Sequence, residues 1–149
     1  MWEYLAGLFD GEGCFSIAKI RNDKGSINII FNATFTGERE HLEMIRQLLL
    51  TENVHCYMTS TKNPIGLQTR PAFKLQIQNR DAIKTFLQKT KQFILLKKPH
   101  YKIMLEAITF KESLPKLSSA TIANLSTFDS YRQRLHQYRK KGPKNLKPW

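Results

Sequence analysis

The chain of 149 residues is short of three features that would point to other classes of protein. It has only two cysteines, Cys14 and Cys56, too few for a disulfide framework and without the spacing of a zinc site. Its longest apolar run, Phe93 to Leu96, is far shorter than a bilayer-spanning segment. The N-terminus also lacks the basic segment of a signal peptide. We therefore expect an intracellular protein, in the cytoplasm or in an organelle.

Acidic residues are scarce relative to basic ones. The chain has 12 Asp and Glu against 24 Lys and Arg, which gives a formal net charge of +12. Such an excess is typical of proteins that bind nucleic acid, because each neutralised phosphate releases counterions. The four histidines are scattered along the sequence, which argues against a histidine-metal nuclease site.

Length and hydrophobic content predict one domain over residues 1–149, with a core at about 2–112 and a C-terminal helix and basic tail at about 116–149. Apolar periodicity predicts the elements inside it. Helices are expected at Trp2–Asp10, Glu38–Leu50, Asp81–Lys89, Pro99–Phe110 and about Ser118–Lys140. Strands are expected around Phe15–Ile17, Ile27–Phe35, Val54–Met58 and Phe73–Ile77.

Two strand pairs in one chain predict a four-stranded antiparallel sheet and an α+β fold. Helices can cover only the face that carries the apolar residues, so the polar face stays open. A strand ribbon with such a face can read bases in the major groove. The candidates are Ser16, Lys19, Arg21, Asn28, Asn32, Tyr57, Thr59, Arg70, Lys74, Gln76 and Gln78. For each of them taken alone, a solvated strand face explains the residue equally well.

The segment Leu5–Gly13 carries the most specific signal. Gly7 lies inside the first predicted helix, where it costs about 1 kcal/mol relative to alanine, which indicates close approach of another backbone. Asp10 and Glu12 lie at the carboxyl end of that helix, where free carbonyls disfavour negative charge. A bound cation would reverse the sign of that interaction.

These nine residues resemble the signature of the LAGLIDADG homing endonucleases. The matches are Leu5, Ala6, Gly7, Leu8, Asp10 and Gly13. The order of predicted elements extends the resemblance over roughly residues 2–110. The family implies an αββαββα fold in which a saddle-shaped sheet, with its helices on one face, lies on the DNA major groove.

The resemblance also implies a site and an assembly. Two copies of the motif helix would pack through Ala6 and Gly7, with Leu5 and Asp10 at the same interface. Each copy would deliver Glu12 to an active site that holds Mg²⁺, or Mn²⁺ or Ca²⁺ in its place, with a carbonyl near Gly11 as a further ligand. Since the chain has one motif, it implies a homodimer, a roughly palindromic target and cleavage that leaves 3′ overhangs.

Basic residues are expected to complete the site. The family places a lysine at the junction that corresponds to Lys97 and Lys98; the position favours Lys97, with Lys98 close behind, and simple solvation of the pair is the alternative. Arg39 falls where some relatives have an active-site arginine. The preceding Thr36 and Gly37 depart from the glutamine that is common there.

The end of the chain is strongly basic. Phosphate contacts are expected there from Arg132, Arg134, Arg139, Lys140 and Lys141, although a solvated basic tail is nearly as good an explanation. The sequence thus predicts an intron-encoded type of DNA endonuclease that binds double-stranded DNA as a homodimer. The main alternative is the same fold acting without cleavage, as an RNA-splicing maturase or a DNA-binding regulator. A ribosomal-type basic protein is a third possibility, which the glycine inside the first helix disfavours.

Overall fold

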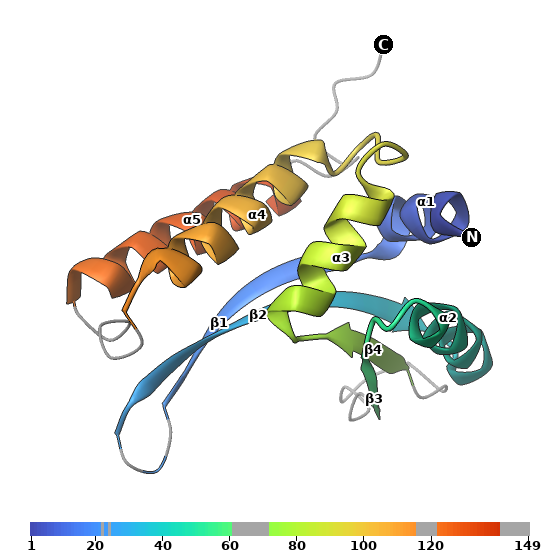
Figure 1. Ribbon diagram of the computed structural model, residues 1–149, viewed down its shortest axis with the longest axis horizontal. Helices are drawn as coiled ribbons and strands as arrows, with labels where there is room; N and C mark the ends of the chain where they lie inside the picture. Colours follow the sequence, from blue (N-terminus) through green and yellow to red (C-terminus); the bar gives the residue numbers. More distant parts are fainter. Residues whose placement is uncertain (22, 24, 61–71, 116–121, 141–149) are drawn as a thin grey trace. The chain divides into compact units, whose positions relative to one another are not determined.

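The computed structural model describes residues 1–21, 23, 25–60, 72–115 and 122–140. Its elements follow the predicted order of helix, hairpin, helix, hairpin and helices (Figure 1). They are α1 (Trp2–Glu12), β1 (Cys14–Arg21), β2 (Ile27–Gly37), α2 (Arg39–Thr51), β3 (Tyr57–Ser60), β4 (Phe73–Ile77), α3 (Arg80–Thr90), α4 (Lys98–Ser113) and α5 (Ile122–Lys140). None of the helices formed by the described residues is long and apolar enough to cross a membrane.

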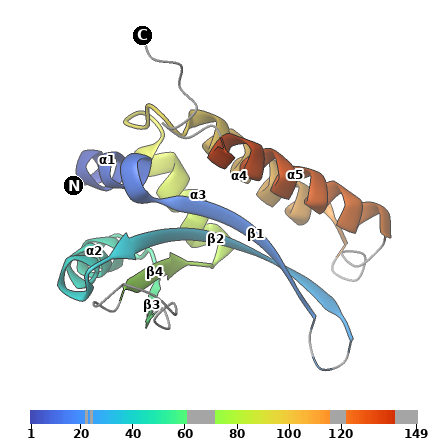
Figure 2. The ribbon, with the colours of Figure 1, turned by 180° about the vertical axis from the view of Figure 1, so that it is seen from behind.

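The strands form one four-stranded sheet in the order β1-β2-β4-β3. Strand β4 is antiparallel to both of its neighbours, β2 and β3, and Figure 2 shows these three strands side by side. Phe35 pairs with Leu75, which in turn pairs with Met58, so these three side chains share a face. The predicted α+β class is therefore confirmed.

The chain divides into two compact units. The first consists of residues 1–14 and 32–97. Its core is an aromatic cluster in which Phe9 of α1 meets Phe35 of β2 and Phe86 of α3, each at 5.1 Å between ring centroids. Phe35 and Phe86 complete the triangle at 5.8 Å. Edge-on packing of this kind explains why α1 and α3 cover the same face of β2.

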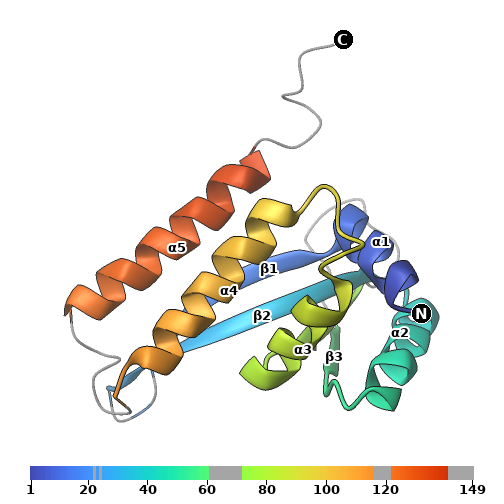
Figure 3. The same ribbon diagram turned by 45° about the horizontal axis from the view of Figure 1, so that its top comes forward.

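The second unit consists of residues 15–31 and 98–149. Phe15 of β1 packs edge-on against Tyr101 of α4 at 5.1 Å, and Phe31 of β2 packs against Phe128 of α5 at 6.3 Å. Helices α4 and α5 lie side by side, and Phe110 joins them by packing on Phe128 at 5.1 Å (Figure 3). The apolar positions of the two strands are thus covered by these helices.

Several predicted boundaries were wrong, among them the end of α1, which extends to Glu12 rather than ending at Asp10. Helix α3 begins at Arg80, one residue before the predicted start at Asp81, and its cap is Asn79, whose side chain accepts the N–H groups of Asp81 and Ala82 at 2.9 and 3.2 Å. Strand β3 begins at Tyr57, three residues later than predicted. The Val54 N–H instead bonds to the Leu49 carbonyl at 2.9 Å, after a left-handed residue at Asn53 (φ 58°), and so closes the end of α2.

Candidate functional site

The carboxyl end of α1 is bound to the segment that connects α3 to α4, through the side chain of Asp10. One carboxylate oxygen accepts the backbone N–H groups of Leu95 and Leu96, each at 2.8 Å. The other oxygen accepts the N–H of Lys97 at 2.7 Å. Asp10 is only 8% exposed. Three converging backbone donors therefore compensate a carboxylate that is otherwise disfavoured at this end of a helix.

The Lys97 side chain returns to the same helix end. Its Nζ donates a hydrogen bond to the main-chain oxygen of Asp10, one of the terminal carbonyls of α1. Partial burial lowers the pKa of the Lys97 ammonium, while the nearby Asp10 and Cys14 groups act in the opposite direction. A positive charge is thus held at the C-terminal turn of α1. Lys98 is the exposed first residue of α4.

Glu12 lies at the last position of α1, and its side chain is exposed. Within the part of the chain that the structure describes, its carboxylate has no hydrogen-bond or ion-pair partner. The same described residues contain no group of three His, Cys, Asp or Glu side chains that could hold a metal ion. One copy of the chain therefore offers a free carboxylate beside terminal helix carbonyls, which are oxygen ligands suited to Mg²⁺ or Ca²⁺.

Helix α1 has two different faces. Leu5, Ala6 and Phe9 are fully buried in the core of the first unit. The opposite face carries Tyr4, Gly7, Leu8 and Gly11, which are exposed or half-buried, and a Cβ added at either glycine would meet nothing within 4 Å. The predicted interface needs correction, because Leu5, Ala6 and Asp10 are buried within the protomer. Of the predicted contacts, Gly7 alone lies on the exposed face.

Gly13 has a structural role that the sequence did not reveal. It takes an extended conformation after α1, and its N–H bonds to the Phe9 carbonyl at 2.8 Å. A Cβ at this position would lie 2.3 Å from the Phe9 ring and 2.6 Å from the Phe9 carbonyl oxygen. Only glycine allows the chain to pass this closely over Phe9. A second unpredicted contact joins α1 to α2, where the Tyr4 hydroxyl lies 2.6 Å from Nε2 of His41.

The first unit brings several predicted DNA contacts together on the sheet face opposite its aromatic core. Cross-strand pairing forms two polar rows over β2, β4 and β3. The rows are Thr36, Lys74 and Thr59, and Thr34, Gln76 and Tyr57. Lys74, Thr59 and Tyr57 are exposed. Partial burial raises the pKa of the Tyr57 hydroxyl above its ordinary value, which favours the neutral form further.

One predicted base contact on this face is largely covered. Asn32 is 7% exposed, and its side-chain oxygen accepts a hydrogen bond from the Gln78 amide at 2.6 Å. Asn32 lies on β2, which is a central strand between β1 and β4. The expectation that Asn32 faces solvent was therefore wrong. The Gln78 amide serves partly as the hydrogen-bond donor to the Asn32 side chain.

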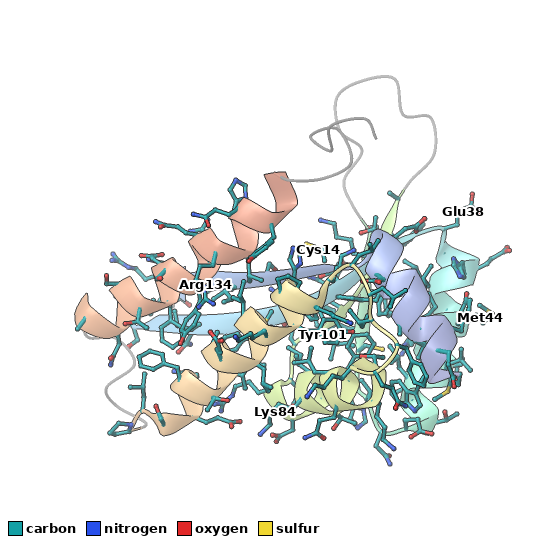
Figure 4. All side chains as sticks on the ribbon, turned by 90° about the horizontal axis from the view of Figure 1, so that it is seen from above. Cys14, Glu38, Met44, Lys84, Tyr101 and Arg134 are labelled. Carbon is teal, nitrogen blue, oxygen red and sulfur yellow. The ribbon has the colours of Figure 1, made fainter. Side chains whose placement is uncertain are left out.

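In the second unit, two predicted DNA contacts form ion pairs instead. Lys19 of β1 donates to Asp129 of α5 at 2.6 Å. Figure 4 labels Arg134 on α5. Its guanidinium donates to Glu106 of α4 at 2.9 Å and stacks over the Tyr131 ring. Arg132 is exposed on α5. These pairs lower the positive charge that Lys19 and Arg134 can offer to a phosphate.

The other predicted positions lie as follows. Ser16 and Arg21 belong to β1 and Asn28 to β2, with Arg21 and Asn28 exposed. Arg39 is the exposed first residue of α2. Arg70 and Lys141 are outside the described residues, as are the side chains of Arg139 and Lys140.

Helix α1 is short and ends in an exposed carboxylate, and strand pairs and helices then follow in repeated order. This order of elements indicates a class of protein. The family model described as the LAGLIDADG-like domain matches residues 1–91. The chain belongs to this family. No curated protein matches the sequence.

Solved structures show the same fold. The DNA complex of the archaeal intron-encoded homing endonuclease I-Vdi141I is 18% identical, with a TM-score of 0.70 over 95% of this chain and 85% of that one. The homing endonuclease I-CvuI, bound to the I-CreI target with Mg and with the DNA not cleaved, is 15% identical (TM-score 0.68; 92% and 80%). The meganuclease I-SmaMI, bound to uncleavable DNA, is 15% identical (0.67; 89% and 44%).

The Asp10 contacts predict a marked loss of stability for Asp10→Asn. The amide keeps one acceptor oxygen but turns a donor toward at least one backbone N–H, so the free energy of unfolding should fall by about 2 to 3 kcal/mol. Chemical denaturation measures the change. Asp81→Asn is the matched control, since the Asp81 side chain is exposed and should change stability by less than about 1 kcal/mol. Equal effects of the two substitutions would contradict the assignment.

Proposed function

We propose that the protein is a homodimeric, divalent-metal-dependent endonuclease that cuts double-stranded DNA at a specific site. The observation that carries this proposal is the exposed Glu12 carboxylate at the last position of α1, which has no partner among the described residues. The Lys97 ammonium binds the Asp10 carbonyl at the same helix end. Membership of the LAGLIDADG-like family and the likeness to DNA-bound homing endonucleases support it.

The residues at the end of α1 fit a hard divalent cation. Glu12 would hold it through its carboxylate, and the main-chain carbonyl of Gly11 would add a second oxygen. Mg²⁺ is the ion we expect, and Mn²⁺ or Ca²⁺ would suit the same oxygen atoms. When bound, such a cation lowers the pKa of a coordinated water and compensates charge on the scissile phosphate. A single protomer supplies few ligands, so DNA phosphate and a second protomer would complete the site.

Lys97 would stabilise negative charge on the phosphate as it is attacked. Its ammonium is already placed by the hydrogen bond to the Asp10 carbonyl and by the three N–H contacts of its segment. Such preorganisation is effective because the donor does not have to be rearranged during the reaction. Lys98 is the alternative that the sequence left open, and Arg39 stays a candidate for a supporting role.

The dimer would form through the exposed face of α1. Gly7 and Gly11 leave room for a close approach between two helices. The chain covers 85% of the I-Vdi141I chain but only 44% of the I-SmaMI chain. The lower share is expected if I-SmaMI contains two such units in one chain. Two-fold symmetry would place two Glu12 carboxylates near each other and favour a roughly palindromic target.

DNA would lie on the polar rows formed by β2, β4 and β3. Lys74 suits guanine, and Gln76 suits adenine, because each can meet the hydrogen-bonding pattern of that base in the major groove. Arg132 would contact phosphate and fix orientation without specifying sequence. Selection from a randomised double-stranded DNA library in the presence of Mg²⁺ would give the target. Absence of cleaved sequences at adequate library depth, together with tight binding to an intron RNA, would favour a maturase.

On a selected target, Glu12→Gln should lower the cleavage rate at least about 1,000-fold, since several kcal/mol of transition-state stabilisation depend on the bound cation. Binding in Ca²⁺ should change far less, because the phosphate and base contacts remain. Rates from single-turnover assays and affinities from gel-shift titration measure the two effects. Glu3→Gln, at the exposed start of the same helix, is the control and should cut at the parent rate. Unchanged cleavage by the Glu12 variant would refute the assignment.

The lowered pKa of Lys97 predicts a pH effect. A lysine whose pKa lies below the ordinary 10.5 loses its charge at lower pH, so the cleavage rate should fall on the alkaline side before that value is reached. Lys97→Arg keeps the charge at high pH and should shift this fall upward, whatever its effect on the maximum rate. A rate in the parent enzyme that instead rises through this range would mean that the neutral amine is the active form.

A further inference from the structure

Strand β1 presents an exposed isoleucine on the face opposite the helices of its unit. On the covered face, Phe15 packs on α4, Ile17 is only 4% exposed, and Lys19 pairs with α5 at 2.6 Å. These three contacts show that the alternation of side chains is unbroken as far as Lys19. Ile20 therefore faces away from α4 and α5, and it is 48% exposed.

Strand β2, the neighbour of β1 in the sheet, shows the same division. Ile29 and Phe31 are buried, and Phe31 packs on α5. Asn28 and Ile30 occupy the alternate positions, where Asn28 is exposed and Ile30 is half-buried. Figure 1 shows α4 and α5 on one side of these two strands. The opposite face of the strand pair thus combines two isoleucines with the exposed amide of Asn28.

Double-stranded DNA is the occupant that fits this face. The chain has a net charge of +12, which attracts a polyanion. Asn28 and Ile30 belong to the same alternate positions of β2 as Thr34 and Thr36, which enter the polar rows. Among the base edges of the major groove, which are otherwise polar, thymine alone presents a methyl group. An isoleucine on a strand that lies in this groove can therefore recognise thymine and no other unmodified base.

We propose that Ile20 is a specificity-determining residue that recognises the 5-methyl group of thymine, with Ile30 as a second apolar contact on the same face. The inference rests on the DNA binding of the proposed function, and it needs neither cleavage nor a particular dimer. The contact excludes water from two apolar groups and involves no charge, so its contribution should vary little with salt concentration. It adds discrimination between thymine and cytosine to the hydrogen bonds expected from the polar rows.

Deoxyuridine tests the contact, because it lacks the 5-methyl group but keeps the base pairing of thymine. Each thymine of the selected target is replaced in turn, and affinity is measured in Ca²⁺ by gel-shift titration. The parent should bind about fourfold more weakly after at least one replacement, which is the factor expected for one buried methyl group. Ile20→Ala should bind the thymine and deoxyuridine forms of that position with affinities within about 1.5-fold of each other.

Leu105→Ala is the matched control. Leu105 is an apolar residue of similar exposure, at 45%, but it lies on α4, so its variant should keep the parent's sensitivity to deoxyuridine. Circular dichroism verifies folding. Ile20→Val, which keeps part of the apolar surface and suits a strand, should retain a reduced sensitivity and replaces Ile20→Ala if that variant does not fold.

The outcomes separate this inference from the proposed function. A parent that binds its target equally well after every replacement overturns the inference and leaves the proposed nuclease intact, as does a selected target without thymine. Equal sensitivity of the parent and Ile20→Ala at every thymine also overturns it. So does an Ile20→Ala variant that changes only the dimer dissociation constant, since protein would then cover this face. A parent that binds no double-stranded DNA removes the proposed function and the inference together.

Discussion

The buried carboxylate of Asp10 is the interaction on which the candidate site depends. It binds three consecutive backbone N–H groups that lie 85 to 87 positions further along the chain. The same contacts fix the end of α1, the Leu95 and Leu96 pair and the backbone of Lys97. These contacts therefore join parts of the candidate site that are far apart in the sequence. Asp10 is thus structural, although it lies two residues from the proposed metal ligand.

The separation of roles between Asp10 and Glu12 follows from helix geometry. Two positions along an α-helix correspond to about 200° of rotation, so the two side chains leave opposite sides of α1. The Asp10 side chain is directed into the protomer, where it meets its backbone donors, and Glu12 stays exposed. Gly13 then lets the chain turn closely over Phe9 and enter β1. The spacing therefore directs one carboxylate to backbone donors inside the protomer and leaves the other exposed.

Local patterns in the sequence were sufficient for the order of elements and for the polar sheet face, because apolar periodicity of 2 or 3.6 residues reflects burial directly. They could not show contacts between distant residues. Asp10 was expected at a hydrogen-bonding helix end, but its partners at Leu95 to Lys97 carry no local signal. Burial of Asn32 under Gln78 and the pairing of Lys19 with Asp129 likewise depend on the tertiary arrangement. Ala6 was misassigned because small residues suit a core as well as a helix crossing.

In the proposed dimer, two copies of α1 would meet through their exposed face and so bring two Glu12 carboxylates to one DNA site. Disulfide cross-linking tests it most directly, with single cysteines at Tyr4, Gly7, Leu8 or Gly11 in a Cys14→Ser, Cys56→Ser background. Covalent dimers should form rapidly at one or more of these positions, since a disulfide needs Cα atoms within about 7 Å. Gln88→Cys, exposed on α3, should cross-link slowly. If no α1 position cross-links faster than Gln88→Cys, two copies do not meet through this face of α1.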